Sequence, residues 1–191
     1  MAEEHAFPAR MAERLDNPGR LAELRIPELL CDIGGVEAGM TCIDLGAGTG
    51  TFTRPLGVLV GSAGRVYAVD ASPELLELLK AKKPPEQVTV VTADFTATGL
   101  DTGIADFCLT AFVLHETRAL EALLKEAFRL LKTDGRLLVV EWRAELEAPG
   151  PPKNIRMTPE RLGDLLAEAG FTGFAWQNWT EKHYFATAEK E

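Results

Sequence analysis

The sequence predicts an α/β fold, in which a mostly parallel β-sheet carries helices on both faces. Short apolar runs alternate with helix-like segments along most of the 191 residues, a pattern typical of βαβ units. The first apolar run, residues 40–45, leads into a glycine-rich turn and then into a helix-compatible stretch over residues 51–60. Near the other end, apolar runs at residues 171–176 and 182–188 follow each other with a short link, which implies an antiparallel pair.

Composition and charge restrict the class of protein. Hydrophobic residues make up 46% of the chain, which is ordinary for a folded domain, and 191 residues suit one domain with a sizeable core. The net charge of −9 argues against nucleic acid as a partner, because phosphate binding needs a basic face. No apolar run approaches the roughly 20 residues of a membrane span. We expect one domain over residues 1–191, with a helical part at 1–35 and the core fold at 36–191.

The cysteines and the N-terminus predict a cytoplasmic protein. Cys31, Cys42 and Cys108 are odd in number, lie in apolar stretches and lack the spacing of metal ligands. We therefore expect buried, reduced thiols and no metal site. The first five residues are acidic and lead into no apolar segment of the signal-peptide kind.

The helical part at residues 1–35 precedes the first strand. The Asp-Asn-Pro sequence at 16–18 predicts a helix start. Pro27 predicts the start of a second helix, which the glycines at 34 and 35 end. These helices either cover one edge of the sheet or form a lid over a ligand, and helical periodicity alone fits both arrangements.

The remaining elements follow the same alternation. Apolar runs predict strands over residues 65–69, 88–91, 104–111 and 136–140. Leucine stripes and proline-led caps predict helices that begin at Pro73, near residue 118 and at Thr158. A loop rich in proline and glycine fills residues 144–157, and a loop of that length is usually functional or mobile.

The glycine-rich turn after the first strand predicts a ligand site. It reads Asp-Leu-Gly-Ala-Gly-Thr-Gly from Asp44 to Gly50. The dinucleotide fingerprint G-x-G-x-x-G seats a pyrophosphate at a helix N-terminus, but here Thr51 stands where that pattern requires its third glycine. The pattern D-x-G-x-G-x-G is matched in full, and its acidic residue suits a cationic ligand better than a pyrophosphate. A turn without a ligand is the third interpretation, but three glycines in five residues cost more chain entropy than an ordinary turn needs.

Asp70 ends the second predicted strand and is a candidate ribose ligand. It lies about 20 positions after Gly50, the distance at which a strand-end carboxylate meets a ribose in nucleotide-binding folds. A carboxylate can accept hydrogen bonds from both ribose hydroxyls. A helix-capping role is the alternative, and because Ser72 can serve as the cap, both roles are compatible.

On these residues the sequence resembles the class I S-adenosylmethionine-dependent methyltransferases, and among them the small-molecule enzymes of the ubiquinone/menaquinone type. The motif at residues 43–50, Asp70, the later strands and the terminal helix and hairpin carry the resemblance over most of residues 36–188. It implies a Rossmann-like three-layer sandwich, whose seven strands have the order 3-2-1-4-5-7-6 with the last strand antiparallel. It also implies S-adenosyl-L-methionine as cofactor and a small-molecule methyl acceptor, and the sequence predicts no particular oligomeric state.

The resemblance further implies where the cofactor is held. An acidic residue at the position of Asp94 meets the adenine amine, and the next backbone N–H, that of Phe95, reaches a ring nitrogen. An exposed loop aspartate is the alternative for Asp94. In a parallel sheet the end of the fourth strand lies beside Asp44, so Ala111 is expected to line the pocket through its backbone. The candidate cofactor-binding residues are Asp44, Gly46, Ala47, Gly48, Gly50, Asp70, Ala71, Asp94, Phe95 and Ala111.

Candidates for the acceptor side follow from position. His115 is the histidine best placed to act as a general base near neutral pH, although with Glu116 it could equally start a helix or satisfy loop backbone. The candidates for substrate contact are Trp142, Arg143, His183 and Tyr184, which lie at strand ends or in the terminal hairpin. The two amphipathic aromatic residues among them fit a packing role as well. No catalytic triad is expected, because a sulfonium methyl is already activated and needs alignment and exclusion of water.

Other functions are compatible with the same residues. A non-catalytic protein that binds the cofactor, its demethylated product or a partner chain would share the fold. A nicotinamide-dependent oxidoreductase is suggested by the glycine spacing and Asp44. A metalloid methyltransferase would need accessible thiols, whereas these cysteines are expected to be buried.

Overall fold

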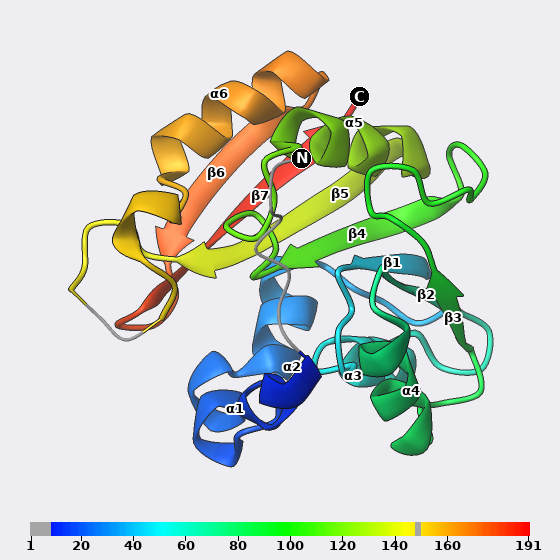
Figure 1. Ribbon diagram of the computed structural model, residues 1–191. Coiled ribbons are helices and arrows are strands. Elements are labelled where there is room, and N and C mark those ends of the chain that lie inside the picture. Colours follow the sequence, from blue (N-terminus) through cyan, green and yellow to red (C-terminus); the bar gives the residue numbers. More distant parts are fainter. Residues whose placement is uncertain (1–8, 148–149) are drawn as a thin grey trace.

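The computed structural model describes residues 9–147 and 150–191, and its centre is a seven-stranded sheet (Figure 1). The strand order is β3-β2-β1-β4-β5-β7-β6. Strands β1 to β5 pair in parallel, and β7 pairs antiparallel with both β5 and β6. The predicted fold class and strand order are thereby confirmed. The strands are β1 (Thr41–Leu45), β2 (Arg65–Asp70), β3 (Val88–Thr92), β4 (Ala105–Ala111), β5 (Leu131–Trp142), β6 (Thr172–Asn178) and β7 (His183–Lys190).

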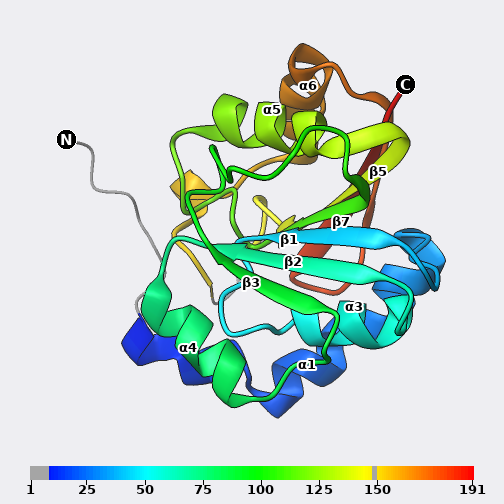
Figure 2. The same ribbon diagram turned by 90° about the vertical axis from the view of Figure 1, so that its right-hand side faces the viewer.

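Helices cover the sheet in two layers, one on each face (Figures 1 and 2). One layer holds α5 (Leu120–Leu130) and α6 (Pro159–Ala169). The other holds α1 (Pro18–Leu24), α2 (Ile26–Glu28), α3 (Thr53–Val60) and α4 (Pro73–Ala81). Short helical turns lie at Ala9–Arg14, Leu29–Ile33 and Lys153–Ile155. Each layer buries apolar side chains against the central strands, so the sheet is covered on both faces as a parallel sheet requires.

Three helices begin where local sequence signals predicted. The side chains of Asn17, Ser72 and Thr158 each accept a hydrogen bond from a backbone N–H three residues later, at 3.1 to 3.3 Å. Each cap is followed by a proline at the start of the helix, where its missing N–H costs nothing. These caps define the first residues of α1, α4 and α6.

The start of β5 differs from the expectation. The fifth strand was expected over residues 136–140, but β5 begins at Leu131 and absorbs the turn signal at 133–135. Asp134 has φ +62°, and the pairing of β4 with β5 shifts register there, so the turn residues form a bulge inside the strand. At the other end of β4, Phe112 has φ +63° and turns the chain out of the sheet at the ligand side.

The N-terminal helices lie against one face of the sheet. Leu24, Leu29 and Leu30 are fully buried in the apolar cluster that contains Phe107 of β4 and Leu138 of β5. Residues 1–8, which belong to the expected helical part, and residues 148–149 of the expected loop lie outside the described residues.

Among the described helices, none has both the length and the apolar character needed to cross a membrane.

Candidate functional site

The glycine loop joins β1 to α3 at the carboxyl edge of the sheet. Gly46 has φ +83°, and a Cβ added there would lie 2.3 Å from Cγ2 of Val113, so only glycine fits. The backbone N–H groups of Gly46 and Ala47 donate to the carbonyl of Val69 at 2.8 and 2.9 Å. The loop is therefore held against the end of β2 and presents bare backbone at the place where open α/β sheets bind ligands.

Asp44 lies beneath this loop rather than on its surface. The residue is 2% exposed, and its Oδ2 accepts a hydrogen bond from Oγ1 of Thr53 at 2.6 Å. Burial raises the pKa of Asp44 to about 7, with the hydrogen bond from Thr53 opposing and the nearby charge of Asp70 adding to the shift. This side chain ties β1 to the start of α3, and a contact with the cofactor stays a prediction.

Asp70 is fixed beside the loop by two backbone groups. Its Oδ2 accepts the N–H of Gly48 at 2.8 Å, and its Oδ1 accepts the N–H of Ser72 at 2.8 Å. Ser72 caps α4 with its own hydroxyl, so the carboxylate of Asp70 is not needed for that role. The carboxylate is half-buried and oriented at the edge of the glycine loop.

The other predicted cofactor residues lie along the same edge. Asp94 is exposed just after β3, and its Oδ1 accepts from the N–H and the hydroxyl of Thr96 at 2.8 and 2.7 Å. Phe95 packs against the apolar core on the α5 side of the sheet. Ala71 is exposed after β2. Leu45 pairs with Thr110, so Ala111 is at the level of the glycine loop, as the sequence predicted.

His115 forms a dyad with a glutamate at the end of β5. Its Nδ1 lies 3.1 and 3.0 Å from the two carboxylate oxygens of Glu141, which is fully buried. Glu141 also accepts the backbone N–H groups of Leu114 and Trp142 at 2.9 and 3.0 Å. Burial lowers the pKa of His115, but the hydrogen bond and charge of Glu141, with the charge of Glu116, outweigh it and leave the pKa raised.

The four predicted substrate residues divide between the two faces of the sheet. In the β5–β7 register Trp142 pairs with His183, and Glu141 pairs with Tyr184. Because side chains alternate along a strand, Trp142 and His183 face the N-terminal helices, whereas Tyr184 faces α6 with Glu141.

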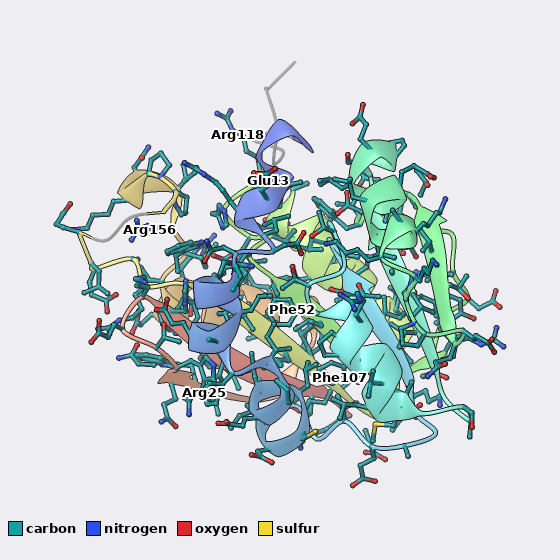
Figure 3. All side chains as sticks on the ribbon, turned by 90° about the horizontal axis from the view of Figure 1, so that it is seen from below. Glu13, Arg25, Phe52, Phe107, Arg118 and Arg156 are labelled. Carbon is teal, nitrogen blue, oxygen red and sulfur yellow. The ribbon has the colours of Figure 1, made fainter. Side chains whose placement is uncertain are left out.

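An aromatic cage surrounds His183 on the face of the N-terminal helices. The ring of His183 is edge-on to Phe112 at 5.0 Å and to Trp142 at 4.5 Å between centroids. The guanidinium of Arg20 in α1 lies 4.7 Å over the ring of Phe112. Phe52, the residue two positions after Gly50, extends the cage toward the glycine loop, 6.3 Å from Phe112, and lies between the N-terminal helices and α3 (Figure 3).

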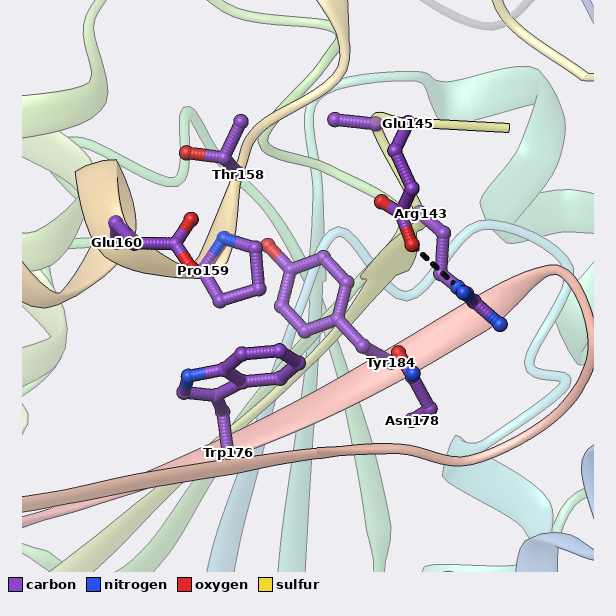
Figure 4. Close-up of a pocket in the computed structure, with 9 residues that line it drawn as sticks. Arg143, Glu145, Thr158, Pro159, Glu160, Trp176, Asn178 and Tyr184 are labelled. Carbon is purple, nitrogen blue, oxygen red and sulfur yellow. Dashed lines mark hydrogen bonds and ion pairs between the residues drawn. The ribbon is translucent and has the colours of Figure 1, made fainter. Parts of the chain in front are cut away.

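A separate pocket of about 390 Å³ lies on the other face, between α6, the end of β5 and the β6–β7 hairpin (Figure 4). Its wall contains Arg143, which pairs with Glu145 at 2.7 Å, and the edge-to-face rings of Trp176 and Tyr184. The hydroxyl of Tyr184 donates to the carbonyl of Met157 at 3.1 Å, and burial raises the pKa of this phenol. Tyr184 therefore has two roles: it packs in the apolar core, and it forms part of the pocket lining.

Several site residues escaped the sequence reasoning. Glu141 directly follows the strand predicted over residues 136–140 and was not among the candidates, although an acidic residue at the end of an apolar run is a signal for a buried polar group that needs a partner. Phe112 and Arg20 come together only through tertiary packing and left no local signal. Asp16 and Lys82 meet over the glycine loop from segments 66 positions apart in the chain.

Comparison with known proteins agrees with this geometry. A family model described as "Methyltransferase domain" matches residues 43–139. The ubiquinone/menaquinone biosynthesis C-methyltransferase UbiE of Yersinia pestis is 30% identical, with 78% of this chain and 73% of that protein aligned. A SAM-dependent methyltransferase from Aquifex aeolicus superposes with a TM-score of 0.88 at 27% identity, covering 95% of this chain and 98% of the other. Phosphoethanolamine N-methyltransferase 2 of Haemonchus contortus, in complex with S-adenosyl-L-methionine, shares the fold with a TM-score of 0.74 at 14% identity, over 87% and 52% of the two chains.

The chain thus belongs to the methyltransferase-domain family and is a class I S-adenosylmethionine-dependent methyltransferase. Its cofactor is S-adenosyl-L-methionine, and it is of the small-molecule type that resembles UbiE. No finding favours the non-catalytic protein or the nicotinamide-dependent oxidoreductase.

Proposed function

We propose that this enzyme holds S-adenosyl-L-methionine across the carboxyl ends of β1 and β2, with the glycine loop under the amino-acid end and Asp70 on the ribose. The observation that carries the proposal is the carboxylate of Asp70, which two backbone N–H groups fix at the rim of a bare glycine backbone. The carboxylates of Asp44 and Asp70 at the loop fit a cationic nucleoside, and the charge of the neighbouring Lys82 is paired with Asp16. Asp94 and the N–H of Phe95 are the proposed adenine contacts, with Ala71 and Ala111 on the flanks.

When bound, the cofactor supplies a methyl group on a sulfonium, ready for displacement by a nucleophile. The protein then has to align the acceptor and exclude water. Residues 15–16 lie over the glycine loop: Oγ1 of Thr49 donates to Asp16 at 3.1 Å, and Cδ1 of Leu15 lies 3.4 Å from the position that a Cβ on Gly48 would take. We infer from these contacts that the N-terminal segment serves as a lid over the glycine loop. The lid and the core fold together form the single domain proposed for residues 1–191.

His115 is the proposed general base, and Glu141 positions it. The carboxylate of Glu141 accepts from Nδ1 of His115, which places the proton of the neutral imidazole on Nδ1. The lone pair for proton transfer is therefore on Nε2, which lies 3.9 Å from the carboxylate of Glu116. An acceptor that must lose a proton can give it to this nitrogen.

The acceptor is proposed to meet Trp142 and His183 on one face and Arg143 and Tyr184 on the other. The Yersinia relative is named for carbon methylation in ubiquinone/menaquinone biosynthesis, which supports a small organic acceptor here. The net charge of −9 supports such an acceptor over a nucleic acid.

A cytoplasmic location is proposed from the thiols. Cys31, Cys42 and Cys108 are all free thiols, and Cys42 and Cys108 are buried as expected, whereas Cys31 is only half-buried, so the expectation was wrong for that residue. Burial raises the pKa of Cys42 to about 12 and also raises the pKa of Cys108. Unreactive reduced thiols are typical of proteins in reducing compartments.

The proposal is tested by calorimetry with S-adenosylhomocysteine, the demethylated product. We expect a Kd below about 1 mM for the wild type and at least about tenfold weaker binding for Asp70→Ala, because two charge-assisted hydrogen bonds to the ribose are lost. Asp101→Ala, a substitution of an exposed aspartate in the loop before β4, is the matched control and should bind as the wild type does. Unchanged affinity in Asp70→Ala would remove the ribose assignment.

A further inference from the structure

His183 carries a buried nitrogen that the fold leaves without a partner. The residue begins β7 and is 2% exposed. Its Nδ1 lies 2.9 Å from Oγ1 of Thr180, whereas its Nε2 is buried and has no hydrogen-bond partner among the described residues. Buried polar atoms in native proteins are nearly always paired, so an exception at a candidate site calls for a reason.

The contacts of Thr180 decide which nitrogen of His183 carries the proton. Oγ1 of Thr180 accepts the backbone N–H groups of Lys182 and His183, both at 3.1 Å. A hydroxyl has two acceptor sites and one proton. With both acceptor sites used, the 2.9 Å contact with His183 is a hydrogen bond only when the hydroxyl donates to Nδ1, in competition with the carboxylate of Glu23, which Thr180 also contacts. Nδ1 is then unprotonated.

The imidazole is neutral near pH 7, because burial lowers the pKa of His183 to about 4. A neutral imidazole without a proton on Nδ1 carries it on Nε2. His183 therefore presents an N–H donor, not a base, inside the cage.

The surroundings of this donor favour an oxygen with negative charge. Phe112 and Trp142 supply apolar walls, and their rings lie 5.9 Å apart. Arg20, Lys182 and Arg156 place positive charge near His183, whereas the charge of Glu23, which is paired with Lys182 at 2.8 Å, opposes them. Burial lowers the pKa of Arg20 to about 10, so its guanidinium stays charged at neutral pH.

The cage adjoins the cofactor edge of the sheet. Phe112 directly follows Ala111 of β4, and Phe52 directly follows the glycine loop and contacts Phe112. Arg20 covers Phe112, and its Nη1 donates to the carbonyl of Leu15 at 2.8 Å, so the same segment covers both the cage and the loop.

We propose that Nε2–H of His183 is the donor that recognises an oxygen of the methyl acceptor, a carbonyl or deprotonated hydroxyl attached to an apolar group that packs against Phe112 and Trp142. This inference rests on the proposed function, because it places the acceptor beside the cofactor. In this proposal His183 binds and selects the acceptor, whereas His115 keeps the role of general base.

Two probes of equal shape test the proposal. Acetophenone carries a carbonyl oxygen, and α-methylstyrene replaces that oxygen with CH₂. With S-adenosylhomocysteine present, ligand-observed NMR should show that the wild type binds the ketone about tenfold more tightly, because only the ketone pairs the donor. His183→Phe keeps a ring without a donor and should abolish the preference, whereas His183→Gln places an amide N–H near the position of Nε2 and should restore much of it.

A second measurement uses the wild-type protein and is independent of variant folding. Long-range ¹H–¹⁵N NMR of the wild-type imidazoles should show His183 protonated on Nε2, with that resonance shifting on addition of acetophenone and not of α-methylstyrene. A proton on Nδ1, or no preference for the ketone in the wild type, overturns the inference. Calorimetry with S-adenosylhomocysteine alone separates this failure from a failure of the proposed function, since the cofactor site does not contain His183.

Discussion

The contact between His115 and the buried carboxylate of Glu141 sets both the protonation of the imidazole and the orientation of its two ring nitrogens. Burial alone would lower the pKa of His115, yet the 3.0 Å contact with Glu141 leaves it raised. A histidine whose pKa is raised on folding binds its proton more tightly in the native state. Its contribution to the free energy of unfolding is complete below the unfolded pKa near 6.5 and is lost as the pH rises through the raised native value.

We expect Glu141→Gln to lower the pKa of His115, because glutamine keeps a polar side chain and removes the charge. The loss of unfolding free energy above about pH 6.5 should then shrink, and the acid limb of any pH–rate profile should move to lower pH. NMR titration of the three histidines, with His115 assigned through His115→Phe, gives the pKa directly.

Glu116→Gln is the control for this prediction, since Glu116 lies 3.9 Å from Nε2 and has the smaller influence. An unchanged pKa of His115 in Glu141→Gln would contradict the dyad.

Among the elements, the N-terminal segment connects the sheet to the ligand edge. Its helices bury leucines on the sheet, while Asp16 reaches the glycine loop and pairs with Lys82, just beyond α4, at 2.5 Å. Nζ of Lys82 also donates to the carbonyl of Thr49 at 2.8 Å. One lysine thus ties the segment, the loop and the end of α4 together.

We expect Lys82→Met to loosen this segment. Methionine keeps the apolar stem of the side chain and removes the two charge-assisted contacts. Hydrogen exchange in residues 15–20 should accelerate, and S-adenosylhomocysteine should dissociate faster, because the segment covers the loop.

Lys80→Met is the matched control, because Lys80 is paired with the exposed Glu77 on the same helix and not with the N-terminal segment over residues 9–20 that the structure describes. Equal exchange in the two variants would show that the Lys82 contacts do not hold the segment.

Across the whole molecule, the sequence predicted what depends on local chemistry. The helix starts at Asn17, Ser72 and Thr158 follow from a cap and a proline, which act within a few residues. The parallel order of the sheet followed from the resemblance, and the antiparallel pairing of its last two strands from their short link. The bulge at Asp134 was missed because a turn signal inside a strand looks the same as a turn between elements.

The candidate site was predictable only in part, for a related reason. Asp70 ends a strand in a known relation to the glycine loop, and its place could be read from spacing. Glu141, Phe112 and Arg20 acquire their roles by meeting His115 and His183 from other elements. The tautomer of His183 depends on two backbone contacts of Thr180, which no sequence pattern encodes.

The central claim is that the glycine loop and Asp70 together hold the cofactor. A crystal structure of the chain with S-adenosylhomocysteine tests it most directly. The account predicts the amino-acid end over Gly46–Gly50 and both ribose hydroxyls within hydrogen-bond distance of the Asp70 carboxylate, about 2.5–3.0 Å. Density for the ligand elsewhere, or a ribose out of reach of Asp70, would contradict it.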